Sequence, residues 1–175
     1  MKNQDYLYLD HAASTPMRKS ALDKYIEAES FGFANSSGGH KLSRNSKNLL
    51  EDSREIIAEL FDSAPSEIIF TSGGTEADNW TIKSLFDSKQ PNNNLVTSNI
   101  EHEAVLASAE WISSNGFQTK YAKSDENGFV TKDEFIKQID DETKVASLMW
   151  GNNETGVIQP INCLLYTSPS PRDSR

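Results

Sequence analysis

The sequence is poor in cysteine, in positive charge and in long apolar runs, and each shortage limits the kind of protein it can be. Its 175 residues hold one cysteine, Cys163, so an internal disulfide framework is excluded. Lys and Arg number 17 against 26 Asp and Glu, and the net charge of −9 argues against a basic surface for nucleic acid. No apolar run has the length of a membrane span, and the first residues lack the apolar stretch of a signal peptide. We therefore expect a cytoplasmic protein without nucleic-acid or membrane partners.

The order of the apolar segments predicts an α/β protein with a mainly parallel sheet and flanking helices. Short apolar runs alternate with longer segments of helical spacing, an order typical of strand–helix–strand units with right-handed crossovers. We expect strands over 68–70, 95–97, 117–122 and 144–150. We expect helices over 17–30, after a polar loop over 31–46, after Gly74, between His102 and Asn115, and after Thr131.

Helical spacing also predicts which side chains of the later helices are buried. A capping box formed by Thr131 and Glu134 is expected to start the last helix. The residues expected to face inward are Val105, Ala109 and Ile112 in one helix and Phe135, Ile136 and Ile139 in the next.

A turn with two consecutive glycines, Gly73 and Gly74, lies where the strand over 68–70 gives way to a helix. The free N–H groups and the dipole of a helix N-terminus form a seat for a phosphate, and Thr75 adds a hydroxyl donor. An ordinary strand–turn–helix with Thr75 as the N-cap explains the same residues equally well. This segment alone leaves both interpretations open.

Three polar segments follow predicted strands or glycine turns: 73–75, 99–102 and 152–154. In parallel α/β sheets, ligands bind beyond the carboxyl ends of the strands. We therefore expect these segments to converge on one ligand site. No pattern of metal ligands accompanies them, and we expect no metal.

Residues 162–175 do not continue the alternating pattern. Their final dozen residues contain two prolines and have neither helix nor strand periodicity. We interpret this segment as a non-homologous tail derived from an adapter or vector, and a natural disordered tail is the alternative. Cys163 lies at this junction and is assigned no role.

Four segments together resemble the cysteine desulfurases, a branch of the class V aminotransferase family. These segments are Tyr8-Leu9-Asp10-His11-Ala12-Ala13-Ser14-Thr15-Pro16, Ile69-Phe70-Thr71-Ser72-Gly73-Gly74-Thr75-Glu76-Ala77-Asp78-Asn79, Glu101-His102-Glu103-Ala104-Val105-Leu106 and Asn152-Asn153-Glu154-Thr155-Gly156-Val157-Ile158-Gln159-Pro160. The resemblance covers about residues 6–161 and implies the amino-terminal part of a pyridoxal 5′-phosphate (PLP) enzyme of transferase fold type I. It implies an extended segment and substrate-side loop over 1–16, an incomplete PLP-binding large domain over 17–161, and the tail over 162–175.

The resemblance implies a role for each matching residue of the cofactor site. Gly74 and Thr75 would hold the cofactor phosphate. His102 would be the catalytic residue, stacking on the pyridine ring and assisting proton transfer at the substrate, for which a planar imidazole is suited. Asn153 would hydrogen-bond the ring hydroxyl oxygen. Without the resemblance, His102 is an ordinary polar loop residue and Asn152-Asn153 is an ordinary turn.

Ala12 and Ala13 would line the substrate pocket, where small side chains leave room for an amino acid; a tight loop is the alternative. The sequence departs from the family in the loop Asn35-Ser36-Ser37, which lacks the usual proline after the asparagine. This departure leaves the substrate-side details of the loop open. His40 and Arg44 nearby are interpreted as polar surface residues.

The family's cofactor-bonding lysine, its carboxylate for the pyridine nitrogen and its nucleophilic cysteine lie in segments that this sequence does not contain. PLP chemistry depends on the first two groups. No Ser-Gly-His-Lys segment is present. No matching context surrounds Lys83, Lys120, Lys123, Lys132, Lys137 or Lys144. We therefore expect the chain as given to be inactive.

The resemblance implies that the complete enzyme converts L-cysteine to L-alanine and passes the sulfur as a persulfide. It would act as a homodimer and serve a sulfur acceptor, such as an iron–sulfur scaffold, in iron–sulfur cluster or thiocofactor synthesis. Another class V enzyme, such as a selenocysteine lyase or an aminotransferase, is one alternative. A noncatalytic phosphate- or nucleotide-binding domain is another, although the glycine turn lacks the Lys-Ser/Thr ending of a P-loop.

Overall fold

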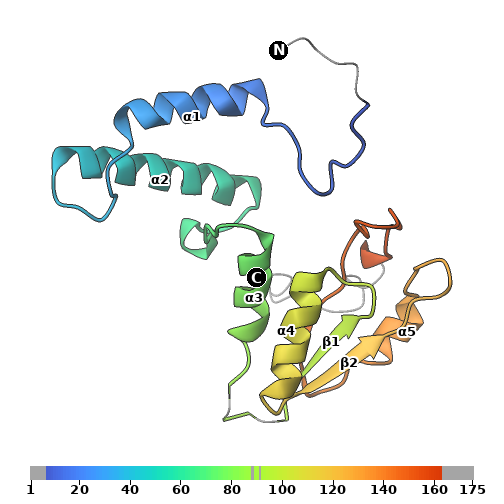
Figure 1. The fold of residues 1–175 in the computed structure, drawn as a ribbon. Coiled ribbons are helices and arrows are strands. Elements are labelled where there is room, and N and C mark those ends of the chain that lie inside the picture. Colours follow the sequence, from blue (N-terminus) through green and yellow to red (C-terminus); the bar gives the residue numbers. More distant parts are fainter. Residues whose placement is uncertain (1–6, 88, 91, 163–175) are drawn as a thin grey trace. The chain divides into compact units, whose positions relative to one another are not determined.

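A computed structural model describes residues 7–87, 89–90 and 92–162 (Figure 1). The chain divides into two compact units, residues 1–70 and 71–175, and each is described by itself. Most of the expected tail, from residue 163 onward, lies outside the described residues.

The first unit consists of two packed helices, α1 (Lys19–Phe31) and α2 (Lys41–Leu60), followed by the short 3-10 helix η1 (Pro65–Glu67). The helix expected over 17–30 is confirmed as α1. The predicted loop over 31–46 is too long, because α2 already begins at Lys41. His40 caps this helix by accepting the N–H of Ser43 at 3.3 Å, and Ser43 itself is buried. The first turn of α2 is polar, so its sequence resembles that of the preceding loop.

The predicted strand over 68–70 is wrong, since no strand is assigned to these residues. The backbone is extended at Ile68, with φ −94° and ψ 123°, but a strand also needs a neighbouring strand to pair with. The guanidinium of Arg54 donates a hydrogen bond to the carbonyl of Ile68 and lies 5.0 Å from the ring centroid of Phe70. A side chain therefore takes the place of a strand partner.

The second unit contains a three-stranded parallel sheet with strand order β2-β1-β3, which confirms the expected sheet type. The strands are β1 (Asn94–Ser98), β2 (Gln118–Ala122) and β3 (Thr143–Ala146). Leu95 pairs with Thr119 on one side and Val145 on the other. The strand expected to reach Trp150 ends at Ala146, because the chain then leaves the ladder.

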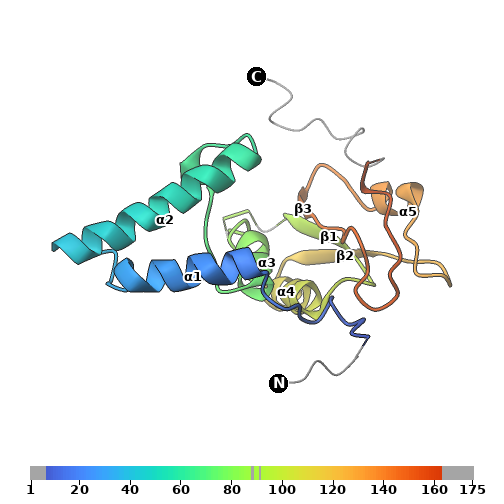
Figure 2. The same cartoon turned by 90° about the horizontal axis from the view of Figure 1, so that it is seen from above.

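Helices cover both faces of the central strand β1 (Figure 2). On one face, Leu95 packs against α3 (Gly74–Lys83) and α4 (Glu103–Ser114); on the other, Val96 packs near α5 (Lys132–Ile136). The first cluster contains Ile82, Leu95, Val105, Ala109 and Ile112, and the second contains Val96, Ala122, Val130 and Phe135. This alternation along β1 is the period of two expected for a strand buried on both faces.

The helix boundaries follow the predicted capping signals closely. Helix α4 ends at Ser114 with Asn115 as its C-cap residue, and Gly116 adopts φ +89°, a left-handed conformation that favours glycine. Thr131 accepts the N–H of Glu134 at 3.2 Å, but the Glu134 carboxylate bonds Lys137 and Gln138, so only half of the capping box forms. Ile139 is 41% exposed, and its predicted inward position is therefore wrong, because α5 ends before it.

A polar cluster closes the amino-terminal end of the sheet. The carboxylate of Asp140 accepts hydrogen bonds from Lys120, from the buried Asn94 at 2.8 Å and from Thr143 at 3.1 Å. These bonds, chiefly the one from Lys120, hold the pKa of the Asp140 carboxyl well below its usual value of 3.8. The ionised carboxylate therefore stabilises the folded sheet.

Acid is expected to remove this contribution. Because the folded-state pKa is lowered, the stabilisation is fully present above roughly pH 4 and is lost as the pH falls toward the folded-state value. The variant Asp140→Asn should unfold at lower urea than the parent at pH 6, and it should lose less further stability below pH 4. Urea unfolding followed by tryptophan fluorescence at several pH values measures both effects. The exposed neighbour Asp141→Asn is the matched control, and equal losses in both variants would contradict the prediction.

Candidate functional site

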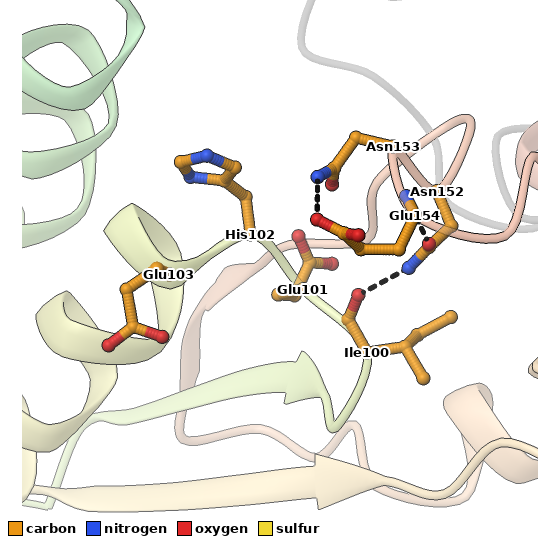
Figure 3. A pocket seen from close by; sticks show the side chains of 7 residues that line it. All are labelled: Ile100, Glu101, His102, Glu103, Asn152, Asn153 and Glu154. Carbon is orange, nitrogen blue, oxygen red and sulfur yellow. Dashed lines mark hydrogen bonds between the residues drawn. The ribbon is translucent and has the colours of Figure 1, made fainter. Parts of the chain in front are cut away.

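A pocket of about 260 Å³ lies at the carboxyl ends of β1 and β3 (Figure 3). Two segments about fifty positions apart in sequence form it, one leading from β1 into α4 and the other following β3. Its lining residues are Ile100, Glu101, His102, Glu103, Asn152, Asn153 and Glu154. The structure therefore brings two of the three predicted loop segments together.

His102 is the N-cap residue of α4. Its Nδ1 accepts the backbone N–H of Ala104 at 3.1 Å, which satisfies one of the donors that every helix start leaves open. An accepting Nδ1 carries no proton, so the neutral ring holds its proton on Nε2. The side chain is exposed, and Nε2 is the nitrogen left to meet a ligand.

The two adjacent asparagines differ in how their side chains are used. The amide of Asn152 donates to the carbonyl of Ile100 at 2.9 Å, and its Oδ1 accepts the N–H groups of Glu154 and Thr155, both at 2.9 Å. The exposed amide of Asn153 makes one described side-chain bond, from Nδ2 to Glu154 at 3.0 Å. Asn152 therefore builds the turn, whereas Asn153 retains a donor N–H and its carbonyl oxygen.

The side chains around the opening point in different directions (Figure 3). The imidazole of His102 and the amide of Asn153 project to the same side of the strand ends. The carboxylate of Glu103 points away from them along α4. Two groups that can hold a planar ligand thus face one region. The buried carboxylate of Glu101, next to His102, bonds Met149 in the segment that carries Asn153.

Glu101 is the residue that sequence reasoning missed. It is only 8% exposed, and its carboxylate accepts the N–H of Met149 at 2.7 Å and the hydroxyl of Ser98 at 3.3 Å. Burial raises the pKa of this carboxyl, and the two hydrogen bonds only partly offset the shift. The run Glu101-His102-Glu103 looks like a solvated charged turn, and nothing in its spacing distinguishes the buried glutamate from the exposed one.

The predicted phosphate seat is the start of α3. Gly73 is the N-cap residue and has no side chain to offer, so the alternative interpretation of Thr75 as the N-cap is wrong. The carboxylate of Glu76 accepts the N–H of Ser72 at 2.7 Å and its hydroxyl at 2.6 Å, and these bonds lower the pKa of Glu76. The first N–H of this helix that bonds within it belongs to Ala77, at 3.1 Å from the carbonyl of Gly73.

Helices α3 and α4 pack side by side, and both begin at the end of the sheet where the strands finish (Figure 1). Asp78 in α3 is close enough to Glu101 to contribute to the raised pKa of that carboxyl. Gly74 and Thr75 therefore lie at the same edge as His102, although they do not line the described pocket.

Ala12 and Ala13 belong to the first unit, whereas all residues that line the pocket belong to the second. They form an exposed turn in which the N–H of Ala13 donates to Asp10 at 3.3 Å. The hydroxyl of Tyr8 closes this turn with bonds to the carbonyls of Asp10 and Ser14. The substrate role assigned to the two alanines remains a prediction.

Within residues 7–87, 89–90 and 92–162, no group of three or more His, Cys, Asp or Glu side chains is placed to hold a metal ion. Among the helices described there, none combines the length and apolar character needed to cross a membrane.

Solved structures with the same fold define the class of protein. A NifS-like protein superposes with a TM-score of 0.83 at 32% identity, covering 90% of this chain and 43% of that one. A structure described as SspA in complex with cysteine superposes with a TM-score of 0.80 at 35% identity, covering 88% and 45%. These likenesses confirm the predicted class, an incomplete α/β large domain of PLP-dependent transferase fold type I.

Sequence comparison assigns the family. A family model for class-V aminotransferases matches residues 7–167, and the chain belongs to this family. It is 38% identical over 156 residues to cysteine desulfurase IscS of Methanosarcina thermophila, covering 89% of this chain and 39% of the relative. It is 40% identical over 156 residues to the putative cysteine desulfurase IscS 1 of Bacillus subtilis, covering 89% and 41%. The chain thus spans about two fifths of the length of these curated relatives.

The capping role of His102 can be separated from any role of its imidazole. His102→Ala removes the acceptor for Ala104 N–H and is expected to lower the free energy of unfolding by about 1 kcal/mol. His102→Asn supplies another good N-cap acceptor and should keep the parent's stability, although the ring is gone. Urea unfolding of both variants beside the parent measures the difference. Equal destabilisation by Asn and Ala would show that His102 does not act as a cap.

Proposed function

We propose that this chain is part of a PLP-dependent cysteine desulfurase. The observation that carries the proposal is the convergence of His102 and Asn153, from segments distant in sequence, on one pocket beside the start of α3. Family membership and the likeness to cysteine desulfurases over most of the chain support it. When bound, PLP would supply an electron sink for breaking bonds at the amino-acid substrate.

The start of α3 suits the cofactor's phosphate. A Cβ added at Gly73 or Gly74 would meet no described atom within 4 Å, so the space beside both glycines is open. The N–H groups of Gly74 and Thr75 lie in the first helical turn, where a helix leaves its donors without intrahelical partners. The exposed hydroxyl of Thr75 adds a donor. These groups would hold the phosphate.

His102 and Asn153 would hold the ring. The imidazole would stack on one face of the pyridine, and its Nε2 would donate a proton or hydrogen bond near the substrate, since Nδ1 is engaged by Ala104. The remaining N–H of Asn153 would donate to the ring hydroxyl oxygen, while Glu154 holds the other. Ala12 and Ala13 would line the substrate pocket.

The substrate and partners follow from the same resemblance. The substrate would be L-cysteine, the molecule named in the description of the SspA structure, and the products L-alanine and an enzyme persulfide. The full-length enzyme would work in the cytoplasm as a homodimer and pass sulfur to an acceptor such as an iron–sulfur scaffold. These steps use the lysine, carboxylate and cysteine that the resemblance places beyond residue 161.

Replacing Thr75 tests the phosphate seat. In the full-length protein, Thr75→Val removes the hydroxyl at nearly constant shape and should weaken binding of pyridoxamine 5′-phosphate by about tenfold, since a phosphate oxygen loses a charge-assisted bond. Thr75→Ser keeps the hydroxyl and should bind as the parent does. Isothermal titration gives the affinities, and thermal unfolding shows whether all three proteins are equally stable. Equal affinity in the Val and Ser variants would remove Thr75 from the seat.

The 175-residue chain by itself is expected to be catalytically inactive. Without the family's lysine segment it should give no absorbance band of lysine-bound PLP and release no alanine from L-cysteine. The cysteine desulfurase of Methanosarcina thermophila is the positive control, and the heat-denatured chain is the negative one. Alanine release above the denatured control would contradict this part of the proposal.

A further inference from the structure

Side-chain bonds join the two segments of the pocket beyond the point where the sheet ladder stops. The last backbone bond between the β1 and β3 regions is from the N–H of Ser147 to the carbonyl of Val96, at 2.9 Å. Beyond it the two segments diverge. Two bonds then connect them: Met149 N–H to the Glu101 carboxylate at 2.7 Å, and the Asn152 amide to the Ile100 carbonyl at 2.9 Å.

Burying Glu101 is costly for folding. A carboxylate that is 8% exposed loses most of its hydration, and the raised pKa of this group records that cost. Its described bonds come from Met149 and Ser98, with no cation bonded to it within the described residues. An apolar side chain would close the same space at a lower desolvation cost, but it could accept no hydrogen bond from Met149. The position of this carboxylate between two ligand-facing segments therefore points to a role in the site.

We propose that Glu101 and Asn152 form a clasp that sets the spacing between His102 and Asn153. Each clasp residue directly precedes one of these two residues, so each crossing bond fixes the backbone from which a ring-holding side chain projects. The clasp residues are positioning residues and contact no cofactor themselves. This inference rests on the proposed function and adds to it the element that places the two ring contacts.

The test uses variants of the full-length protein that remove single clasp bonds. Glu101→Ala removes the acceptor for Met149, whereas Glu101→Gln keeps a carbonyl oxygen in its place. Asn152→Asp keeps the oxygen that accepts from Glu154 and Thr155 but loses the donor to Ile100, and it tests the clasp without a cavity. Glu110→Ala is the matched control, because Glu110 is an exposed glutamate of α4 that does not line the pocket.

Two readouts separate positioning from general stability. Pyridoxamine 5′-phosphate has the ring, hydroxyl and phosphate but no aldehyde, so its affinity reports these contacts without the bond to lysine. Hydrogen–deuterium exchange over the peptide containing Met149 reports the clasp directly and needs no cofactor. Both are measured well below the melting temperature of every variant, so that loss of folded protein does not enter.

We expect Glu101→Ala and Asn152→Asp to weaken binding about tenfold or more, and Glu101→Gln and Glu110→Ala to stay close to the parent. Exchange at Met149 should rise in Glu101→Ala and stay near the parent level in Glu101→Gln. Equal affinities in Glu101→Ala and Glu110→Ala, or unchanged Met149 exchange in Glu101→Ala, would overturn the clasp. If the parent binds no pyridoxamine 5′-phosphate, the proposed function fails, and the exchange comparison alone decides whether the clasp exists.

Discussion

The second unit depends on the burial of one strand, β1. All five of its residues are buried, with a parallel neighbour on each edge and a hydrophobic cluster on each face. A strand enclosed in this way has one register and one direction, because a slip of one residue would exchange Leu95 and Val96 between the two clusters. The loop that leaves β1 therefore starts from a fixed point, and the pocket is built on that loop. Precision at His102 originates in apolar packing several residues earlier.

Parallel topology then determines which groups meet. All three strands run the same way, so the chain leaves β1 and β3 at the same edge and enters α4 from that edge. Helix α3 starts there as well. Helix N-termini, with N–H groups that lack intrahelical partners, therefore lie at this edge. The loops that follow the strands lie there as well, outside the hydrogen-bonded ladder. Such an edge favours anions and planar polar ligands, and this physical preference agrees with the cofactor proposed for the chain.

Local patterns predicted much of the fold, and contacts between distant segments account for what they did not predict. Helical spacing located α4, including its buried Val105 and Ile112. The capping-box pattern located Thr131 as the N-cap of α5. The strand over 68–70 failed because Arg54 takes the carbonyl that a neighbouring strand would need. The last strand is shorter than expected because the chain leaves the ladder after Ser147, and Met149 bonds the Glu101 side chain instead. Sequence motifs pointed to His102 and Asn153, which the fold brings to one pocket and whose roles remain predictions. They did not point to Glu101, since its burial depends on a partner 48 residues away.

The division of polar groups between folding and ligand binding is the most informative feature of the site. His102 uses one ring nitrogen as a helix cap and keeps the other available; Asn152 is fully engaged in its turn, while its neighbour of identical chemistry is not. At α3, the carboxylate of Glu76 bonds Ser72 and does not engage the N–H groups of Gly74 and Thr75, which we propose hold the phosphate. Each ligand-facing group thus stands beside a similar group already committed to the backbone. The side chains bonded to the backbone fix the local geometry. The groups proposed to meet the ligand therefore lose little conformational freedom on binding.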